Sequence, residues 1–113
     1  MIYVEHDHVV NNVEVLRDGM IVFGGGTAIN TYLYEEGYMD LYGSARDTFV
    51  KATASGMFIK DGGRAFYGSI RGKVYVSSGG WANYLTTTAQ TGCITVSTGG
   101  HAYHTFIEEN GIM

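Results

Sequence analysis

The chain has 113 residues, of which 45% are apolar and 16% charged, a composition that excludes intrinsic disorder and allows one folded domain. The formal net charge of −4 argues against a dedicated nucleic-acid binder, because phosphate contacts dominate that kind of affinity. Seventeen Gly and no Pro indicate a chain that turns often on residues able to adopt positive φ.

A short unit repeats along the chain from the first residue onward. Residues 72–82 and 92–102 show it most clearly, with a glycine, two alternating apolar residues, a Gly-Gly pair and an alanine at matching places. Aligning the chain on that alanine gives six anchors, at Val10, Ala28, Ala45, Ala65, Ala82 and Ala102. Successive alanines are 17, 20, 17 and 20 residues apart. Six copies therefore cover residues 1–113 as a single domain without a linker.

Each copy contains two short runs of alternating apolar residues. The runs before the anchors are Ile2 and Val4, Met20 and Val22, Met39 and Leu41, Met57 and Ile59, Val74 and Val76, and Ile94 and Val96. The runs after the anchors are Val13 and Val15, Thr31 and Leu33, Thr48 and Val50, Gly68 and Ile70, Leu85 and Thr87, and Thr105 and Ile107. Such alternation predicts β-strands, and the glycines between the runs predict corners.

One copy alone is too small to bury its apolar side chains. Stacked copies can bury them if matching strands pair in parallel, with rungs about 4.8 Å apart. The sequence therefore predicts an all-β fold, a parallel β-helix (β-solenoid) of about six rungs of 17–20 residues. We expect a right-handed coil, because crossovers between parallel strands almost always have that hand.

Two segments carry a family resemblance. Val-Ser-Ser-Gly-Gly-Trp-Ala at 76–82 and Val-Ser-Thr-Gly-Gly-His-Ala-Tyr-His-Thr-Phe-Ile at 96–107 resemble the repeat of AIDA-type autotransporter adhesins, V-x-x-G-G-x-A-x-x-T-x-V. Degenerate copies of this pattern cover nearly the whole chain. The resemblance implies a right-handed β-helix of the passenger-domain kind, and for function it implies surface adhesion.

Several short motifs invite a chemical interpretation that their context does not favour. On a strand His6 and His8 would share a face while Asp7 points away, which leaves two ligands where zinc usually needs three or four. Glu35-Glu36 falls beside a corner, without the cleft and defined separation that glycosidase carboxylates need.

The remaining two motifs also have structural explanations. Gly24-Gly25-Gly26-Thr27 lacks the Lys and the helix of a phosphate-binding loop. Cys93 is the only cysteine, so no internal disulfide can form, and nothing nearby in sequence would activate its thiol. We therefore expect no enzyme activity and no catalytic, cofactor or metal site.

Aromatic residues recur at positions that should point outward. Phe66 and Tyr103 come one residue after their anchors, Tyr32, Phe49 and Phe106 come four after, and Trp81 directly precedes its anchor. Aromatic side chains exposed in a row are typical of protein contacts. We therefore predict a non-enzymatic protein-binding solenoid that contacts its partner through these six residues.

Self-association is also expected, because uncapped solenoid ends expose strand edges. A second hypothesis is a phage- or mobile-element-encoded inhibitor of the anti-CRISPR kind, which would block a host nucleic-acid-acting defence complex either sterically or by acidic mimicry. Glu35, Glu36, Asp40 and Asp47 would then form an acidic face. A third hypothesis is an adhesin-like surface or glycan-binding module.

The N-terminal residues show no signal peptide, and no apolar run is long enough for a transmembrane helix. We therefore expect a cytoplasmic protein, or a cell-surface one if the chain is a fragment of an adhesin.

Overall fold

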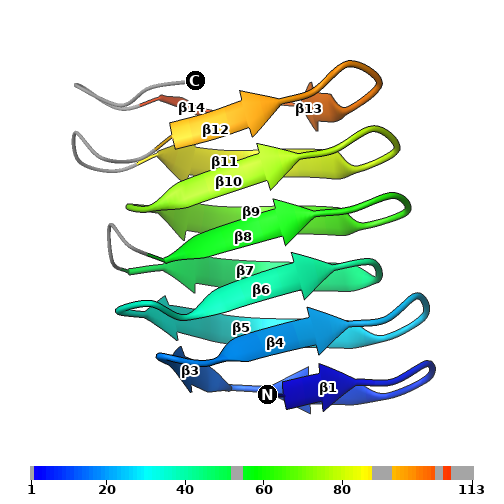
Figure 1. The fold of residues 1–113 in the computed structure, drawn as a ribbon, viewed down its shortest axis with the longest axis vertical. Coiled ribbons are helices and arrows are strands. Elements are labelled where there is room, and N and C mark those ends of the chain that lie inside the picture. The colour runs from blue at the N-terminus through cyan, green and yellow to red at the C-terminus, as the bar shows by residue number, and fades with distance from the viewer. Residues whose placement is uncertain (1, 52–54, 88–92, 104–105, 108–113) are drawn as a thin grey trace.

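A computed structural model describes residues 2–51, 55–87, 93–103 and 106–107 of the chain. It is an all-β parallel solenoid, as the repeat predicts (Figure 1). As the chain climbs, the strands in front run to the right and those behind return to the left, which makes the coil right-handed (Figure 1). The described part contains no helix, and so none that is long and apolar enough to cross a membrane.

The strands form two parallel sheets. Sheet A has six strands in the order β1 (Ile2–Val4), β4 (Gly19–Val22), β6 (Tyr38–Leu41), β8 (Gly56–Ile59), β10 (Lys73–Val76) and β12 (Cys93–Val96). Sheet B contains β2 (Val9–Asn11), β3 (Glu14–Leu16), β5 (Thr27–Tyr34), β7 (Ser44–Val50), β9 (Arg64–Ile70), β11 (Trp81–Thr87), β13 (His101–Tyr103) and β14 (Phe106–Ile107). We number the rungs 1 to 6 by the sheet A strand with which each begins. Five complete turns of the coil separate β1 from β12.

Equivalent residues of successive copies pair across the rungs. The anchor alanines are in register, with Ala28 beside Ala45 and Ala82 beside Ala65 and Ala102. Met39 pairs with Met20 although the connection after β6 is two residues shorter than the one after β4, so the deletion is absorbed outside the strands. The alignment made from the sequence is therefore also the alignment of the strands in space.

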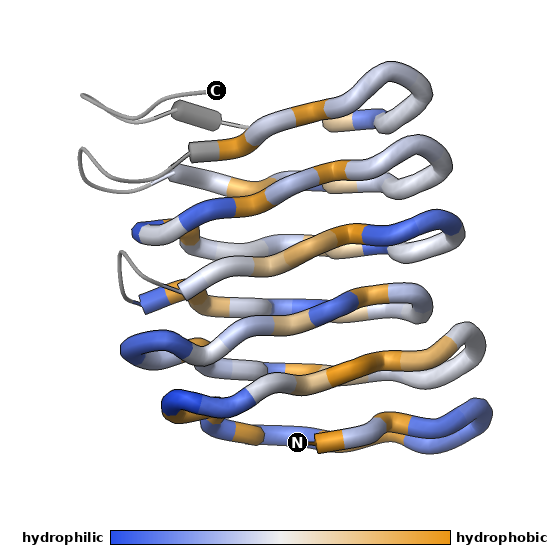
Figure 2. Tube along the Cα trace, viewed as in Figure 1, coloured by the Kyte–Doolittle hydropathy of each residue, from blue (hydrophilic) through white to orange (hydrophobic). Residues whose placement is uncertain are grey.

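Columns of apolar side chains fill the space between the sheets. The buried core consists of Val4, Val15, Met20, Val22, Ala28, Leu33, Met39, Leu41, Ala45, Val50, Met57, Ile59, Ala65, Ile70, Val74, Val76, Ala82, Leu85 and Ile94. Figure 2 shows apolar positions recurring at the same place in rung after rung. Burial of each large side chain stabilises the fold by about 1.5–3 kcal/mol. Val96 was expected in this core but is 39% exposed, because β12 is the outermost strand of sheet A.

The first corner joins sheet A to sheet B. In rungs 1, 2, 4, 5 and 6 it has four residues, and the third of these, Asp7, Gly25, Gly62, Gly79 or Gly99, adopts a positive φ. Rung 3 turns this corner with two residues, Tyr42 and Gly43. Its connection therefore projects less far than its neighbours (Figure 1).

The second corner bends the sheet B strands in their middle. Asn12, Asn30, Asp47, Tyr67 and Tyr84 occupy equivalent places and all have φ between 54° and 61°. The paired registers of β5, β7 and β9 skip Asn30, Asp47 and Tyr67, because the backbone turns there. Asn and Asp tolerate this conformation better than other residues with a Cβ, so the two tyrosines are the unusual members of the column.

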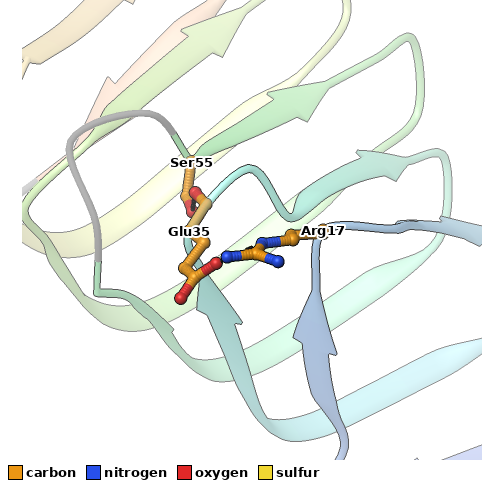
Figure 3. Close-up of polar contacts among 3 residues, drawn as sticks. All are labelled: Arg17, Glu35 and Ser55. Carbon is orange, nitrogen blue, oxygen red and sulfur yellow. Dashed lines mark hydrogen bonds and ion pairs between the residues drawn. The ribbon is translucent and has the colours of Figure 1, made fainter.

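The third corner returns the chain to sheet A. Arg17 and Glu35 also have left-handed backbones there, and their side chains form an ion pair between rungs 1 and 2. The hydroxyl of Ser55 donates to the carbonyl oxygen of Glu35, which ties rung 3 to rung 2 (Figure 3). Polar side chains therefore link successive rungs at this corner.

Candidate binding surfaces

The predicted contact residues lie on sheet B, but they do not stack as one continuous column. Tyr32 pairs with Phe49, and the next positions in that column are Ser69 and Thr86. In the neighbouring column Asn83 separates Phe66 from Tyr103. The aromatic side chains form one group on rungs 2 and 3 and another on rungs 4 to 6, and Arg46 rather than an aromatic residue pairs with Phe66 between them.

One group lies on rungs 2 and 3. The rings of Tyr32 and Phe49 stack with their centroids 5.0 Å apart, and Tyr34 stacks beside Tyr32 at 6.3 Å. The ammonium of Lys51 lies 5.6 Å from the centre of the Phe49 ring. Both rings of the central pair are half-buried. The contact between Tyr32 and Phe49 is the inter-rung stacking by which aromatic pairs stabilise a sheet.

A larger group lies on β9, β11 and β13. Trp81 stacks on His101 at 4.2 Å and on Tyr103 at 5.5 Å between ring centroids. Tyr103 is 46% exposed. Phe66 and Trp81 line a hollow of about 270 Å³ with Arg64 and Asn83. We call Phe66, Tyr67, Trp81, Tyr84, His101 and Tyr103 the aromatic cluster.

Tyr67 and Tyr84 extend the cluster to the second corner. Their rings stack at 5.1 Å, and the side chains are 48% and 41% exposed. Both residues have left-handed backbones, with φ of 61° and 57°. A left-handed conformation costs about 1–2 kcal/mol for a residue with a Cβ. Tyr67 and Tyr84 both adopt this unfavourable conformation, and their large rings face outward.

Phe106 belongs to β14, where its backbone pairs with Thr86 of β11. Its side chain is outside the described residues. For the predicted contact residue Phe106, the structure therefore gives only the strand to which it belongs.

The four acidic candidates lie on three separate parts of the surface. Glu35 and Glu36 are on the third corner, where Glu35 is paired with Arg17. Asp47 is in the second corner, and Asp40 points outward from β6 in sheet A. These four carboxylates do not form a single acidic face.

Sheet A carries a second aromatic surface that the sequence analysis did not identify. Tyr3 stacks with Phe23 at 6.1 Å, and Phe58 with Tyr75 at 5.3 Å. The ammonium of Lys60 lies 5.6 Å from the centre of the Phe58 ring. The signal was present in the sequence, because Tyr3, Phe58 and Tyr75 alternate with the inward apolar positions of their strands, and Phe23 directly follows β4.

A further hollow lies at the short first corner of rung 3. It measures about 940 Å³ and is lined by Ile21, Phe23, Gly24, Gly25, Asp40, Tyr42, Gly43, Ser44, Asp61, Gly62 and Arg64. The four-residue corners of rungs 2 and 4 form its walls, and Tyr42, Gly43 and Ser44 form its floor. We call this hollow the notch.

The residues considered for chemistry have local partners. A ring nitrogen of His6 lies 3.1 Å from the carbonyl oxygen of Gly24, and the other lies 3.3 Å from the carboxylate of Asp7. His6, Asp7 and His8 are all exposed. The described residues contain no group of three or more His, Cys, Asp or Glu side chains arranged to hold a metal ion.

Comparison with known proteins finds a solved structure with a similar fold. No protein-family model matches the sequence, and neither does any curated protein. The structure is similar to the crystal structure of the TibA55–350 fragment, hyper-glycosylated in a reaction catalysed by TibC, with a TM-score of 0.92 and 25% sequence identity.

The match covers 97% of this chain and 41% of the TibA fragment, which comes from an autotransporter adhesin of the AIDA-like family. The repeat motif itself has no sequence match to support it and stays a resemblance. The chain therefore has an adhesin-like β-solenoid fold, similar to less than half of that fragment.

Proposed function

We propose that this chain is a non-enzymatic binding module that attaches to another protein through the aromatic cluster. One observation carries the proposal. Trp81, His101 and Tyr103 form a three-ring stack on the outer face of sheet B, beside a hollow that also contains Arg64. Trp, Tyr and Arg are the residue types that contribute most to protein–protein interfaces.

The rigidity of the site supports the same function. Trp81 projects from β11, whose inward residues Ala82 and Leu85 are fully buried, and the inward Ala102 of β13 packs partly buried against the same core. A surface held in this way loses little conformational entropy on binding. The adhesin-like fold of the TibA fragment is consistent with a module that acts by surface contact.

A paired-variant experiment tests this function. The chain is used to capture partners from a lysate, each captured partner is identified by mass spectrometry, and its affinity is measured with purified protein by calorimetry. Replacing Trp81 and Tyr103 by Ala should weaken binding about thirtyfold or more, which corresponds to at least 2 kcal/mol at the centre of an interface.

The matched control replaces Tyr3 and Tyr75, two exposed aromatic residues of sheet A, by Ala. It should leave the affinity unchanged within about threefold. Retained affinity in the Trp81/Tyr103 variant, or turnover of a substrate by the wild-type chain, would contradict the proposed function. Light scattering with mass determination shows whether the partner is a second copy of the chain.

The inhibitor hypothesis stays a prediction with its own test. Charge mimicry of a nucleic acid requires carboxylates gathered on one face, whereas Glu35, Asp40 and Asp47 lie on separate parts of the surface. Capture at two salt concentrations separates the two functions, because mimicry predicts binding that falls steeply with salt.

A further inference from the structure

A ladder of backbone hydrogen bonds joins the first corners of successive rungs. The N–H of Asp7 donates to the carbonyl of Gly25 at 3.1 Å, that of Gly62 donates to Gly79 at 3.0 Å, and that of Gly79 donates to Gly99 at 3.0 Å. All these residues have a positive φ. Each ladder residue therefore directs its N–H toward the next rung and its carbonyl toward the previous one.

Rung 3 interrupts this ladder, because its two-residue corner has no equivalent left-handed residue. Within the described residues, the N–H of Gly25 and the carbonyl of Gly62 have no hydrogen-bond partner in the protein. They lie on opposite walls of the notch, separated by two rung spacings of about 4.8 Å each. One inserted peptide residue, by its own C=O and N–H, would satisfy both groups.

The side chain of the residue that precedes each ladder residue explains why the notch is open. A Cβ built on Gly25 would overlap the His6 ring, one on Gly79 the Asp61 carboxylate, and one on Gly99 the Ser78 hydroxyl, so those side chains cover the corner of the next rung. The equivalent residue facing rung 3 is Gly24, where a Cβ would meet nothing within 4 Å. At this corner position rung 2 therefore places no side chain over rung 3.

The side chains of the notch indicate what could enter it. Asp40 makes no ion pair or hydrogen bond with any described residue, and it is half-buried between Ile21 and Phe58 in the register of sheet A. Phe23 and Tyr42 lie on the same side of the notch, and Arg64 lies on the sheet B side. A carboxylate beside aromatic rings favours a cationic side chain.

We propose that the notch binds an exposed β-turn of a partner protein. One residue of that turn occupies the missing ladder position, accepting a hydrogen bond from the N–H of Gly25 and donating one to the carbonyl of Gly62. A neighbouring lysine or arginine of the turn lies against Asp40, while carbonyl oxygens or an acidic side chain of the turn face Arg64. The proposal rests on the proposed protein-binding function but assigns a second site, which shares only Arg64 with the hollow beside the aromatic cluster.

The probe for the test is a displayed library of loops of seven random residues, each closed by a disulfide and selected on the full chain. Selected loops are then synthesised, and their affinities are measured for wild type, Gly24→Tyr and Asp40→Asn. The tyrosine fills the notch from a position with free space around its Cβ. Thr98→Tyr, at the same corner position of rung 6, is the matched control.

We expect loops enriched in Lys or Arg whose affinity falls at least tenfold in Gly24→Tyr and Asp40→Asn but changes less than twofold in Thr98→Tyr. Hydrogen exchange of the Gly25 amide should slow when such a loop binds, a measurement on the wild-type chain that does not depend on the folding of any variant.

Other outcomes overturn the notch proposal. Loops that keep their affinity for Gly24→Tyr but lose it when Trp81 and Tyr103 are replaced would leave the proposed function standing. If a neutral oligosaccharide bound in the notch without slowing hydrogen exchange of the Gly25 amide, the notch would be a glycan-binding site and not a site for a β-turn. The absence of any bound loop would contradict the notch proposal alone, because the proposed function is tested separately with the Trp81/Tyr103 variant and its captured partners.

Discussion

At the scale of single residues, the least expected feature is three buried hydroxyl groups. The side chains of Thr31, Thr48 and Thr87 are at most 1% exposed, and their oxygens have no hydrogen-bond partner among the residues that the structure describes. An unsatisfied buried polar group costs about 1–3 kcal/mol. These threonines keep the shape of valine inside the core but lower its stability.

Replacing Thr48 by Val should therefore raise the free energy of unfolding, by about 1 kcal/mol. The change keeps the volume and removes the unpaired oxygen, and urea denaturation measures it. The matched control is Val50→Thr on the same strand, which adds a hydroxyl to the core and should lower stability by about 1–3 kcal/mol. Destabilisation by Thr48→Val would show that its hydroxyl has a partner.

At the scale of elements, the corners decide where the chain tolerates a larger side chain. A Cβ on Gly63 would overlap the carbonyl oxygen of Leu41 in the previous rung, whereas one on Gly24 would meet open space. Neither glycine has a positive φ. The two positions therefore differ in contact with the neighbouring rung and not in intrinsic backbone strain.

Gly63→Ala should lower the free energy of unfolding by about 1–3 kcal/mol, because the rungs must move apart to admit the methyl group. Gly24→Ala should change it by less than about 0.5 kcal/mol. Thermal unfolding followed by circular dichroism compares the two directly. Equal losses of stability in the two variants would mean that contact with the neighbouring rung does not limit side-chain size at these positions.

The sequence could predict the elements because each strand carries its own alternation of apolar residues. It could not predict the bends in sheet B, where Asn12 and Tyr67 share a left-handed conformation although their side chains have little in common. It also placed Phe49 and Phe66 in one strip, whereas Phe49 pairs with Ser69 and Phe66 pairs with Arg46, so the aromatic residues form two groups. The spacing of the repeat determines which residues pair across rungs. The residue types at those paired positions determine where aromatic side chains are in continuous contact.

At the scale of the whole molecule, stability depends on stacking. Each inner strand of sheet A pairs with a strand on either side, and the core between the sheets runs through all rungs. In such a quasi-one-dimensional fold, damage to a central rung weakens the interfaces on both sides of it. Central core residues should therefore be the most sensitive to truncation.

Leu41→Ala should lower the free energy of unfolding by about 2–5 kcal/mol, because it leaves a cavity in the middle of the core. Leu16→Ala is the matched control, since Leu16 is 57% exposed and Leu41 is fully buried. The control should cost less than about 0.5 kcal/mol. Similar losses in the two variants, measured by urea denaturation, would argue against a single core at this position.

The sequence by itself determined the all-β solenoid, its rung length, its register and most of its core, because a repeating pattern buries its apolar side chains only when the copies stack. The tertiary structure alone decided which outward residues meet. Trp81 and His101 are 20 positions apart in sequence, yet their rings stack because adjacent rungs bring them together. The notch depends in the same way on three rungs, since a two-residue deletion becomes a hollow only between two longer corners.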